Sequence, residues 1–531
     1  MVEVSGGTIK KYSGKIKPCY LRLVLDKFYC CLMRRLRLML LFPYTLLVVA
    51  IAACTDNYDN YSDNPGDVLA FSTDTVAFDT ILSTVTTPIA AFMVYNNNSK
   101  SLLISSVSLA QGDAGHFRVV VDGMAGTRFE NIEIGAKDSI FVFVNVKLNE
   151  NGGAEPVLYE DYVVFRTNGV EQKILLQAYG QDVYICKGKI FETSETLPND
   201  KPYLIYDSLV VKEGVTLSIR QGTVFFMHQN SEIQVHGTLV AEGTREAGIV
   251  FRGDRMDNDY MVNIPYDRIP GQWGGFRFYE TSFNNELDYV YIRNGLYGLS
   301  FDVSTTEQSK LKITNSVVTN VKGTLISATN CLIEATNCEF SNSRDDLLYL
   351  AGGKYSFTQC TMANYYPSIV QWGWGTSSNQ TVELTNRMPV LDNTGNQVTY
   401  VPAPLEKADF INCIIYGSNS RGGIRLAKDT VNDPGTTYNY EFLNCLVLYD
   451  DKKSKDRFTD CVFNKDPRFL NTKLTDDKSK SIPYDFRIDS ISPARNTAHV
   501  ETARKFPYDI NGVDRFADEG PDIGGYEYNK D

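Results

Sequence analysis

A short phrase that recurs in the second half of the chain constrains the fold more than any other feature. Thr, Asn or Gln, Ser or Cys, and a final Asn recur with a spacing of 22 residues in three segments, 313–320, 335–342 and 357–364. Related phrases return at irregular spacing around Cys413, Cys445 and Cys461. A period of roughly 20 to 50 residues is typical of solenoids, in which each repeat buries its inner face only against its neighbours. The phrase therefore predicts stacked coils of short parallel strands.

The residue types in this phrase have a physical interpretation in such a stack. Equivalent residues of adjacent coils lie about 4.8 Å apart, so Asn side chains at one position can hydrogen-bond along the stack. The neighbouring Ser or Cys is small and can point inward. The chain holds 11 Cys and no CxxC pair. We therefore predict a column of buried thiols at this position, and no metal site.

Phrases on both sides of the repeat extend the pattern. Upstream, several short apolar segments end at Gly, namely within 210–226, 233–253 and 270–278, as sharp corners between sheets require. Downstream, the chain carries DPRF at 466–469, SPARN at 492–496 and PDIGGYEY at 521–528.

These phrases resemble the first coils and the C-terminal cap of bacterial secreted β-helix proteins of the pectate-lyase-like superfamily. The resemblance covers about residues 203–531. It implies a right-handed parallel β-helix over 203–470 and a cap over 471–531 that covers the exposed strand edges at the open end.

A different pattern occupies residues 68–182. Apolar and polar residues alternate there as in strands, for example at 117–121 and 139–144, and turns such as Asn151-Gly152-Gly153 separate the strands. Several short strands at this spacing predict a β-sandwich. The region resembles the immunoglobulin-like modules that follow the lipid anchor in Bacteroidetes surface lipoproteins, which implies a spacer. The fold class predicted for the whole chain is therefore all-β.

The N-terminal region indicates an export signal. A basic stretch and an apolar run fill residues 33–53, and small residues precede Cys54, as in a bacterial lipobox. The alternative is a single transmembrane helix, for which the apolar run is short. We predict lipidation at Cys54, a flexible tether over 54–67 and a location on the outer membrane facing the exterior. Residues 1–32 carry no signal feature, and we interpret them as upstream of the true start.

Charge and motifs exclude several functions. The formal net charge of −12 disfavours nucleic-acid binding, which requires basic surfaces. No GxSxG phrase or phosphate-binding loop is present, so neither a serine triad nor a nucleotide cofactor is predicted.

Four charged residues are candidates for catalysis. Arg344, Asp345 and Asp346 follow the second repeat phrase directly, and Arg425 lies further along. Paired carboxylates with a basic partner could serve as acid and base or bind Ca²⁺, as the resemblance to polysaccharide lyases and glycoside hydrolases implies. The alternative is a solvated turn. The resemblance departs from polygalacturonases, because His236-Gly237 precedes the Asp pair instead of following it.

Aromatic residues form the second candidate site. Tyr365, Tyr366, Trp372 and Trp374 lie in a long insertion, about 365–408, after the third repeat phrase. Exposed aromatic side chains on a rigid solenoid suit stacking on sugar rings, and long loops often carry function. The alternative is that they pack the insertion against the coils. Acidic residues of another loop, Asp254, Asp257, Asp259 and Asp267, could add acidic contacts, but we expect them to be solvated.

The leading hypothesis is a lipid-anchored surface protein without catalytic activity that binds a polysaccharide or glycoprotein glycan or has a structural role. The alternative is a polysaccharide lyase or glycoside hydrolase that acts through Asp345, Asp346 and Arg344 or Arg425, and Ca²⁺ is expected only under the lyase alternative. A third hypothesis is an adhesin-like stalk. Contact with the membrane is expected only through the lipid.

Overall fold

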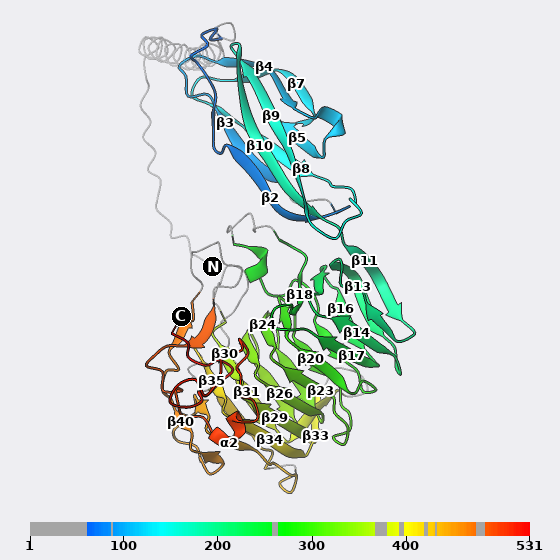
Figure 1. Cartoon of the computed structure of the whole chain (residues 1–531), viewed down its shortest axis with the longest axis vertical. Coiled ribbons are helices and arrows are strands. Elements are labelled where there is room, and N and C mark those ends of the chain that lie inside the picture. Colours follow the sequence, from blue (N-terminus) through cyan, green and yellow to red (C-terminus); the bar gives the residue numbers. More distant parts are fainter. Residues whose placement is uncertain are drawn as a thin grey trace, which may run out of the picture.

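Nearly all the regular structure is β-strand, arranged in two units that follow each other along the chain (Figure 1). The structure is a computed structural model, and it describes residues 61–85, 89–256, 264–366, 380–391, 398–418, 423–430, 433–473 and 484–530. The predicted signal segment, Cys54, Trp372 and Trp374 lie outside these residues. Among the described residues, no helix is long and apolar enough to cross a membrane.

The first unit consists of two five-stranded sheets that enclose one hydrophobic core. In spatial order, the first sheet contains β1 (Ala70–Phe71), β3 (Ala90–Tyr95), β8 (Ser139–Val146), β5 (Phe117–Val121) and β6 (Met124–Gly126). The second contains β2 (Thr75–Leu82), β10 (Val170–Gln181), β9 (Val157–Thr167), β4 (Leu102–Leu109) and β7 (Arg128–Ile134). Along β8, Val142 and Val144 are buried while Phe141 and Phe143 are exposed, which is the period-2 alternation of a half-buried strand.

The second unit is a stack of coils in which parallel strands form three columns, here called faces A, B and C. Face A contains β15 (Val224–Met227), β18 (Ile249–Gly253), β21 (Val290–Arg293), β24 (Val317–Val321), β27 (Glu339–Ser343), β30 (Thr361–Asn364), β35 (Ile414–Gly417), β38 (Leu446–Val447) and β40 (Val462–Phe463). Face B contains β16 (Glu232–Val235), β19 (Phe276–Phe278), β22 (Leu299–Phe301), β25 (Ile326–Thr329), β28 (Leu348–Ala351), β31 (Val382–Thr385) and β36 (Ile424–Ala427). Face C contains β12 (Glu195–Leu197), β14 (Thr216–Arg220), β17 (Thr238–Glu242), β20 (Asn285–Asp288), β23 (Leu311–Thr314), β26 (Leu332–Thr336), β29 (Gly353–Thr358), β34 (Leu405–Ile411), β37 (Glu441–Leu443) and β39 (Phe458–Thr459).

The predicted repeat is confirmed as the register of this stack. The chain passes from face C to face A to face B in each full coil, as in β23, β24 and β25. On face A, Val317 pairs with Glu339, and Glu339 pairs with Thr361, so successive partners are one repeat apart. Apolar side chains of all three faces fill one continuous core. Aromatic rings stack within it, for example Phe357 on Phe410 with centroids 5.1 Å apart.

The recurring Asn has a different main cause from the predicted ladder. Asn315, Asn337, Gln359, Asn412 and Asn444 all have a left-handed backbone, with φ between 47° and 55°. Asn tolerates this conformation better than other residues with a Cβ atom, so it marks the corner between faces C and A. A ladder bond does occur between Asn337 Nδ2 and Asn315 Oδ1, at 3.3 Å. Conformation at the corner therefore explains the phrase better than side-chain stacking.

The neighbouring Ser or Cys points inward, as predicted. Cys338, Cys360, Cys413 and Cys445 are fully buried free thiols. Each Sγ lies within 3.2 to 3.4 Å of the carbonyl oxygen two residues earlier in the chain, and Ser316 Oγ donates in the same way at 2.6 Å. A small side chain with a hydrogen-bond donor satisfies a carbonyl group at the corner, which accounts for the Ser or Cys at this place.

The first end of the stack differs from the predicted boundary at residue 203. Strand β11 (Tyr184–Phe191) pairs with β13 (Tyr203–Val211), and β13 pairs with the first strands of both face A and face B. The coils therefore start before residue 203. Most of β11 is exposed or half-buried because it has a neighbour on one side only. It therefore lacks the apolar alternation that marks later strands in the sequence.

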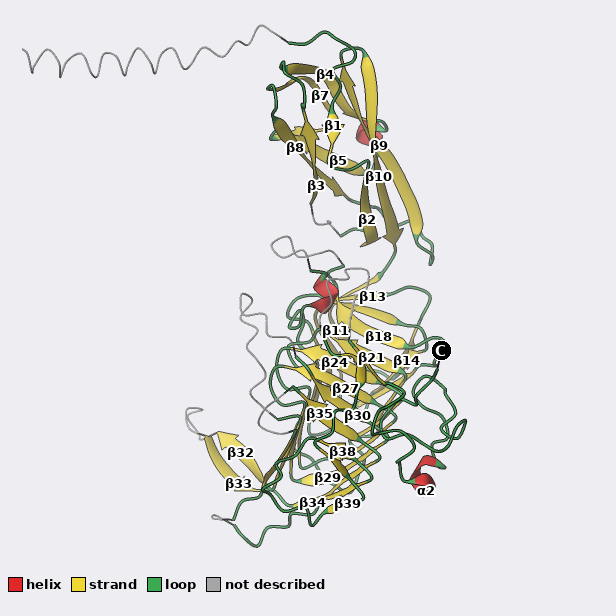
Figure 2. Ribbon diagram, turned by 90° about the vertical axis from the view of Figure 1, so that its left-hand side faces the viewer, coloured by secondary structure: helices red, strands yellow, loops and turns green. Residues whose placement is uncertain are grey.

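The C-terminal segment lies along the flank of the coils and not over their end (Figure 2). It contains the hairpin of β41 (Phe469–Asn471) and β42 (Asp485–Ile488) and the short helix α2 (Val500–Ala503). Its apolar residues pack on the outer side of face A, against Ile414 and Leu446. A second hairpin, β32 (Arg387–Leu391) and β33 (Val398–Pro402), projects from the opposite side of the stack in this view.

The phrase PDIGGYEY explains how this segment is held. The Gly525 N–H donates to Thr361 Oγ1 at 3.0 Å. A Cβ atom on Gly525 would lie 3.1 Å from the Cys338 carbonyl oxygen, so glycine permits the close approach to the coil. Tyr526 and Glu527 then bond to Glu339 and Arg515. These contacts hold the C-terminal segment on the coils.

Candidate functional site

Three outward-facing residues form a row on face B near the end of the stack. Tyr349 of β28 pairs with Glu383 of β31, and Glu383 pairs with Arg425 of β36. Their neighbours in each strand, such as Leu348, are buried in the core, so the period-2 alternation places these three side chains outside. Arg425 Nη1 lies 3.3 Å from Glu383 Oε2. The predicted basic residue Arg425 therefore stands beside a carboxylate that we did not predict.

The predicted triplet Arg344, Asp345 and Asp346 lies at the turn that leads into β28. Arg344 Nε and Asp345 Oδ1 form an ion pair at 3.3 Å, and 38% of the Asp345 side chain is exposed. Asp346 turns the other way, and its Oδ1 accepts the Gln380 N–H at 2.8 Å. The two aspartates thus have separate partners. Asp346 belongs electrostatically to the row on face B, since Glu383 and Arg425 both affect its pKa.

Burial dominates the electrostatics of this group. The pKa of Asp346 is raised to about 6, mainly by desolvation and also by the charge of Glu383, while the Gln380 N–H and Arg425 oppose the shift. Desolvation also raises the pKa of Glu383, which Arg425 and Arg387 oppose. The pKa of Tyr349 rises to about 12, first through burial and then through Glu383. The site therefore holds two carboxyl groups with elevated pKa values beside two guanidinium groups, a combination common at functional sites.

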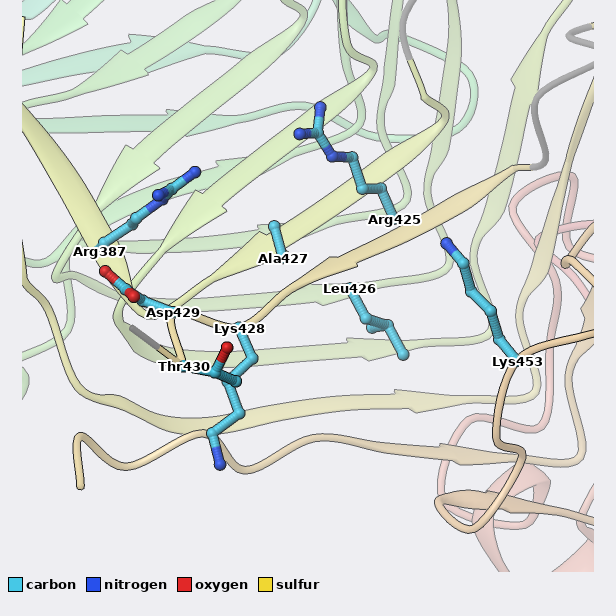
Figure 3. Close-up of a pocket in the computed structure, with 8 residues that line it drawn as sticks. All are labelled: Arg387, Arg425, Leu426, Ala427, Lys428, Asp429, Thr430 and Lys453. Atoms are coloured by element: carbon cyan, nitrogen blue, oxygen red, sulfur yellow. The ribbon is translucent and has the colours of Figure 1, made fainter. Parts of the chain in front are cut away.

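A basic cavity of about 560 Å³ adjoins this row (Figure 3). Its lining consists of Arg387, Arg425, Leu426, Ala427, Lys428, Asp429, Thr430 and Lys453. In Figure 3 the guanidinium groups of Arg387 and Arg425 lie on one side of β36, Lys453 extends toward β36 from another segment, and Lys428 extends away from the two guanidinium groups. Among the described residues, neither Lys428 nor Lys453 forms an ion pair. The volume lies within the range of about 300 to 1,000 Å³ that is usual for ligand sites.

The predicted aromatic site is only partly within the described residues. Tyr366 is 4% exposed and packs against Ile269. Tyr365 packs against Phe469 and Phe486 of the C-terminal hairpin. These contacts match the alternative in which the aromatic side chains pack the insertion against the coils. Trp372 and Trp374 remain predicted binding residues in the insertion that leads to Gln380.

The expectation of a solvated acidic loop is wrong for two of its residues. Asp267 is 5% exposed and accepts from Arg293 Nε at 2.9 Å. Asp254 Oδ2 lies 2.6 Å from His228 Nδ1. Asp267 thus fixes the loop against Arg293 of face A, and Asp254 binds His228 in the turn after β15. Asp257 and Asp259 lie outside the described residues.

The residues at the site do not favour Ca²⁺. Calcium takes six to eight oxygen ligands, whereas Asp345 and Asp346 direct oxygens to Arg344 and to the Gln380 N–H. Within the described ranges, no group of three His, Cys, Asp or Glu side chains is placed to hold a metal ion.

Sequence reasoning missed Glu383, Arg387 and Lys453. The alternation in Val382-Glu383-Leu384 would place Glu383 outward. However, an insertion separates β30 from β31 and another separates β31 from β34, so the repeat spacing gives no alignment of Glu383 with Arg425. Lys453 reaches the cavity from a turn after β38, for which the repeat has no equivalent position.

Comparison with known proteins gives no family. No protein-family model matches the chain, and no curated protein matches it. Solved structures match with low similarity. The catalytic domain of a GH87 alpha-1,3-glucanase is 10% identical over 70% of this chain and 90% of that chain, with a TM-score of 0.17. The ASH / PapD-like domain of human CEP192 is 10% identical over 24% of this chain and 94% of its own length, with a TM-score of 0.16.

A family 123 glycoside hydrolase from Clostridium perfringens is 9% identical over 22% of this chain, with a TM-score of 0.16. The match spans 26% of the length of that hydrolase. At such TM-scores, none of these likenesses supports a conclusion about this chain.

Proposed function

We propose that the protein binds an acidic glycan in the basic cavity on face B. The observation that carries this proposal is that Arg387, Arg425 and Lys453 all line one cavity (Figure 3). The chain as a whole has a net charge of −12. A cavity lined by several cationic side chains therefore differs in charge from the protein as a whole. Guanidinium groups bind carboxylate and sulfate groups through paired N–H donors. A glycan with such groups offers both the charge and the hydroxyls that this surface can bind.

We infer further that the protein is anchored on the outer surface of a Bacteroidetes-like bacterium through a lipid on Cys54. The support is the signal pattern over 33–53 and the small residues before Cys54. The finer fold assignment, an immunoglobulin-like sandwich before a right-handed parallel β-helix, belongs to the same proposal. Labelling cells with a fatty-acid analogue tests the anchor, since Cys54→Ala should abolish both the label and the membrane association.

A second candidate function is cleavage of the bound polysaccharide. The specific observation is the pair of carboxyl groups with raised pKa values, Asp346 and Glu383, beside Arg425. A carboxyl group with a pKa near 6 can donate a proton to a leaving oxygen while a second carboxylate assists. Under this function the acidic glycan is a substrate and not only a ligand.

A screen of the full chain against acidic polysaccharides separates the two functions. Binding is measured by calorimetry, and cleavage by reducing ends and by absorbance of unsaturated products. Binding without product supports the proposed function. Product that disappears in both Asp346→Asn and Glu383→Gln would establish the second candidate, and absence of both signals across uronate and sulfated glycans would contradict both.

A further inference from the structure

A second cavity, of about 450 Å³, lies where the C-terminal segment packs on face A. Glu339 of β27 lines it from the coils, and residues 484–487 line it from the C-terminal hairpin. Asn511, Tyr526 and Asn529 close it from the last residues of the chain. None of the residues of the basic cavity lines it. It exists only because two distant parts of the chain meet there.

The charge of this acidic cavity is opposite to that of the basic one. Its lining holds three carboxyl groups, those of Glu339, Asp485 and Glu527, and one guanidinium group, that of Arg487. Arg487 Nη2 is paired with Asp485 Oδ2 at 2.7 Å. Arg515, which lies outside the lining, pairs with Glu527, so Glu339 is the carboxyl group of the lining that forms no ion pair among the described residues. An anionic ligand would meet this carboxyl group unfavourably, whereas a ligand rich in hydroxyl groups would supply donors to it.

The carboxylate of Glu339 is held in a fixed position. Ser341 Oγ donates to its Oε1 at 2.6 Å, and the Tyr526 hydroxyl donates to its Oε2. Desolvation raises the pKa of Glu339, and the charge of Asp485 adds to the shift. Because the Glu339 carboxylate has few hydrogen bonds to water, a hydrogen bond from a ligand hydroxyl would stabilise it.

Aromatic side chains lie beside the Glu339 carboxylate and provide apolar surface for a sugar ring. The rings of Tyr484 and Phe486 are stacked, with centroids 5.9 Å apart and an interplanar angle of 6°. Phe486 is 2% exposed, so Tyr484 is the ring of this pair that can meet a ligand. Tyr484 and Tyr526 are half-buried and both line the cavity. The negative face of an aromatic ring attracts the polarised C–H groups on one face of a sugar ring. Fixed carboxylates with aromatic rings beside them can therefore hold a sugar ring by its hydroxyls and its C–H face.

We propose that the acidic cavity is a second glycan site, which takes a sugar unit without acid groups. It lies on face A, whereas the basic cavity lies on face B, and the two cavities share no lining residues and have opposite charge. The C-terminal segment is part of this site, in addition to its role in covering face A. A glycan that alternates acidic and uncharged units would then meet sites of matching charge on the same molecule.

The test is a titration of the full chain with uncharged oligosaccharides (cello-, malto-, xylo- and chito-oligosaccharides) and with oligogalacturonate, followed by calorimetry and saturation-transfer NMR. Glu339→Gln keeps the shape and removes the charged acceptor, and it should weaken binding of the uncharged ligand about tenfold or more. Asn529→Trp places a large ring in the cavity from an exposed position near the end of the chain, so it blocks the site without touching the core.

Arg425→Ala is the matched control, because it alters only the basic cavity and should leave this binding unchanged. The proposal is overturned if no uncharged oligosaccharide binds, if Glu339→Gln and Asn529→Trp bind it as the wild type does, or if oligogalacturonate competes for this cavity. Because acidic-glycan binding at Arg425 is measured separately, failure of one site does not decide the other.

Discussion

Arg425 and Glu383 form an ion pair of 3.3 Å between strands that are adjacent on face B but 42 residues apart in the chain. The side chain of Glu383 is 13% exposed and that of Arg425 is 55% exposed. Glu383 thus neutralises part of the charge that Arg425 offers to a ligand. The strength of this ion pair therefore affects how strongly the basic cavity attracts anions.

Removal of the Glu383 charge should therefore strengthen the binding of an anionic glycan. Glu383→Gln keeps the size of the side chain but frees Arg425 from its ion pair. We expect the affinity for heparin, measured by calorimetry, to rise several-fold, on the order of 1 kcal/mol. Glu334→Gln is the control, because Glu334 is exposed on face C, and this variant should bind heparin with unchanged affinity. An unchanged or lower affinity in Glu383→Gln would mean that the ion pair itself positions Arg425 for the ligand.

Anion binding should also depend on pH through Asp346. The carboxyl group of Asp346 has a pKa raised to about 6, so it takes up a proton as the pH falls through that value and its negative charge near Arg425 disappears. Sulfate groups remain ionised, so the affinity for heparin should rise as the pH falls from about 7 to about 5. In Asp346→Asn the affinity should be high at both pH values. A pH dependence of equal size in this variant would assign the titration to another group.

The C-terminal segment should depend on one buried ion pair. Arg515 and Glu527 have side-chain exposures of 0% and 4%, and Arg515 Nη2 also donates to Asn337 Oδ1 at 3.0 Å. Arg515→Ala leaves a buried carboxyl group without its partner, a change that costs roughly 3–5 kcal/mol. We expect hydrogen-exchange protection to fall over residues 494–528.

Arg504→Ala removes the exposed pair with Glu501 and provides the comparison. It should change stability by less than about 0.5 kcal/mol. Equal protection of the C-terminal segment in both variants would contradict the role assigned to Arg515.

The left-handed corners can be tested at Gln359, whose φ is 53°. Neither amide atom of Gln359 has a hydrogen-bond partner among the described residues. Gln359→Asn suits the backbone better and should not lower the unfolding midpoint in urea. Gln359→Val places a β-branched residue in a left-handed conformation and should cost about 1–3 kcal/mol. If the two variants had equal midpoints, conformation would not explain the recurring Asn.

The sequence permits prediction of the stack but not of the cavities. The repeat around Asn337 and Cys338 is local and periodic, so it predicts coils and the inward thiols. The basic cavity is lined by Arg387 and Arg425, which insertions of unequal length separate in the sequence. The repeat spacing therefore does not predict that these two residues lie together. The C-terminal phrases are recognisable, but their place on the flank depends on the fit of Gly525 against Cys338, which only the fold provides.

The most direct test of the account is calorimetric titration of the full chain with an acidic glycan, in parallel with the double variant Arg387→Ala/Arg425→Ala. Arg128→Ala, in the sandwich with a side chain that is 66% exposed, is the control for loss of charge. We expect binding to the wild type and to the control. In the double variant we expect affinity lower by about 100-fold or more, since two charge-assisted contacts are lost and each is worth roughly 1.5–3 kcal/mol. Equal binding by the double variant and the wild type would contradict the account.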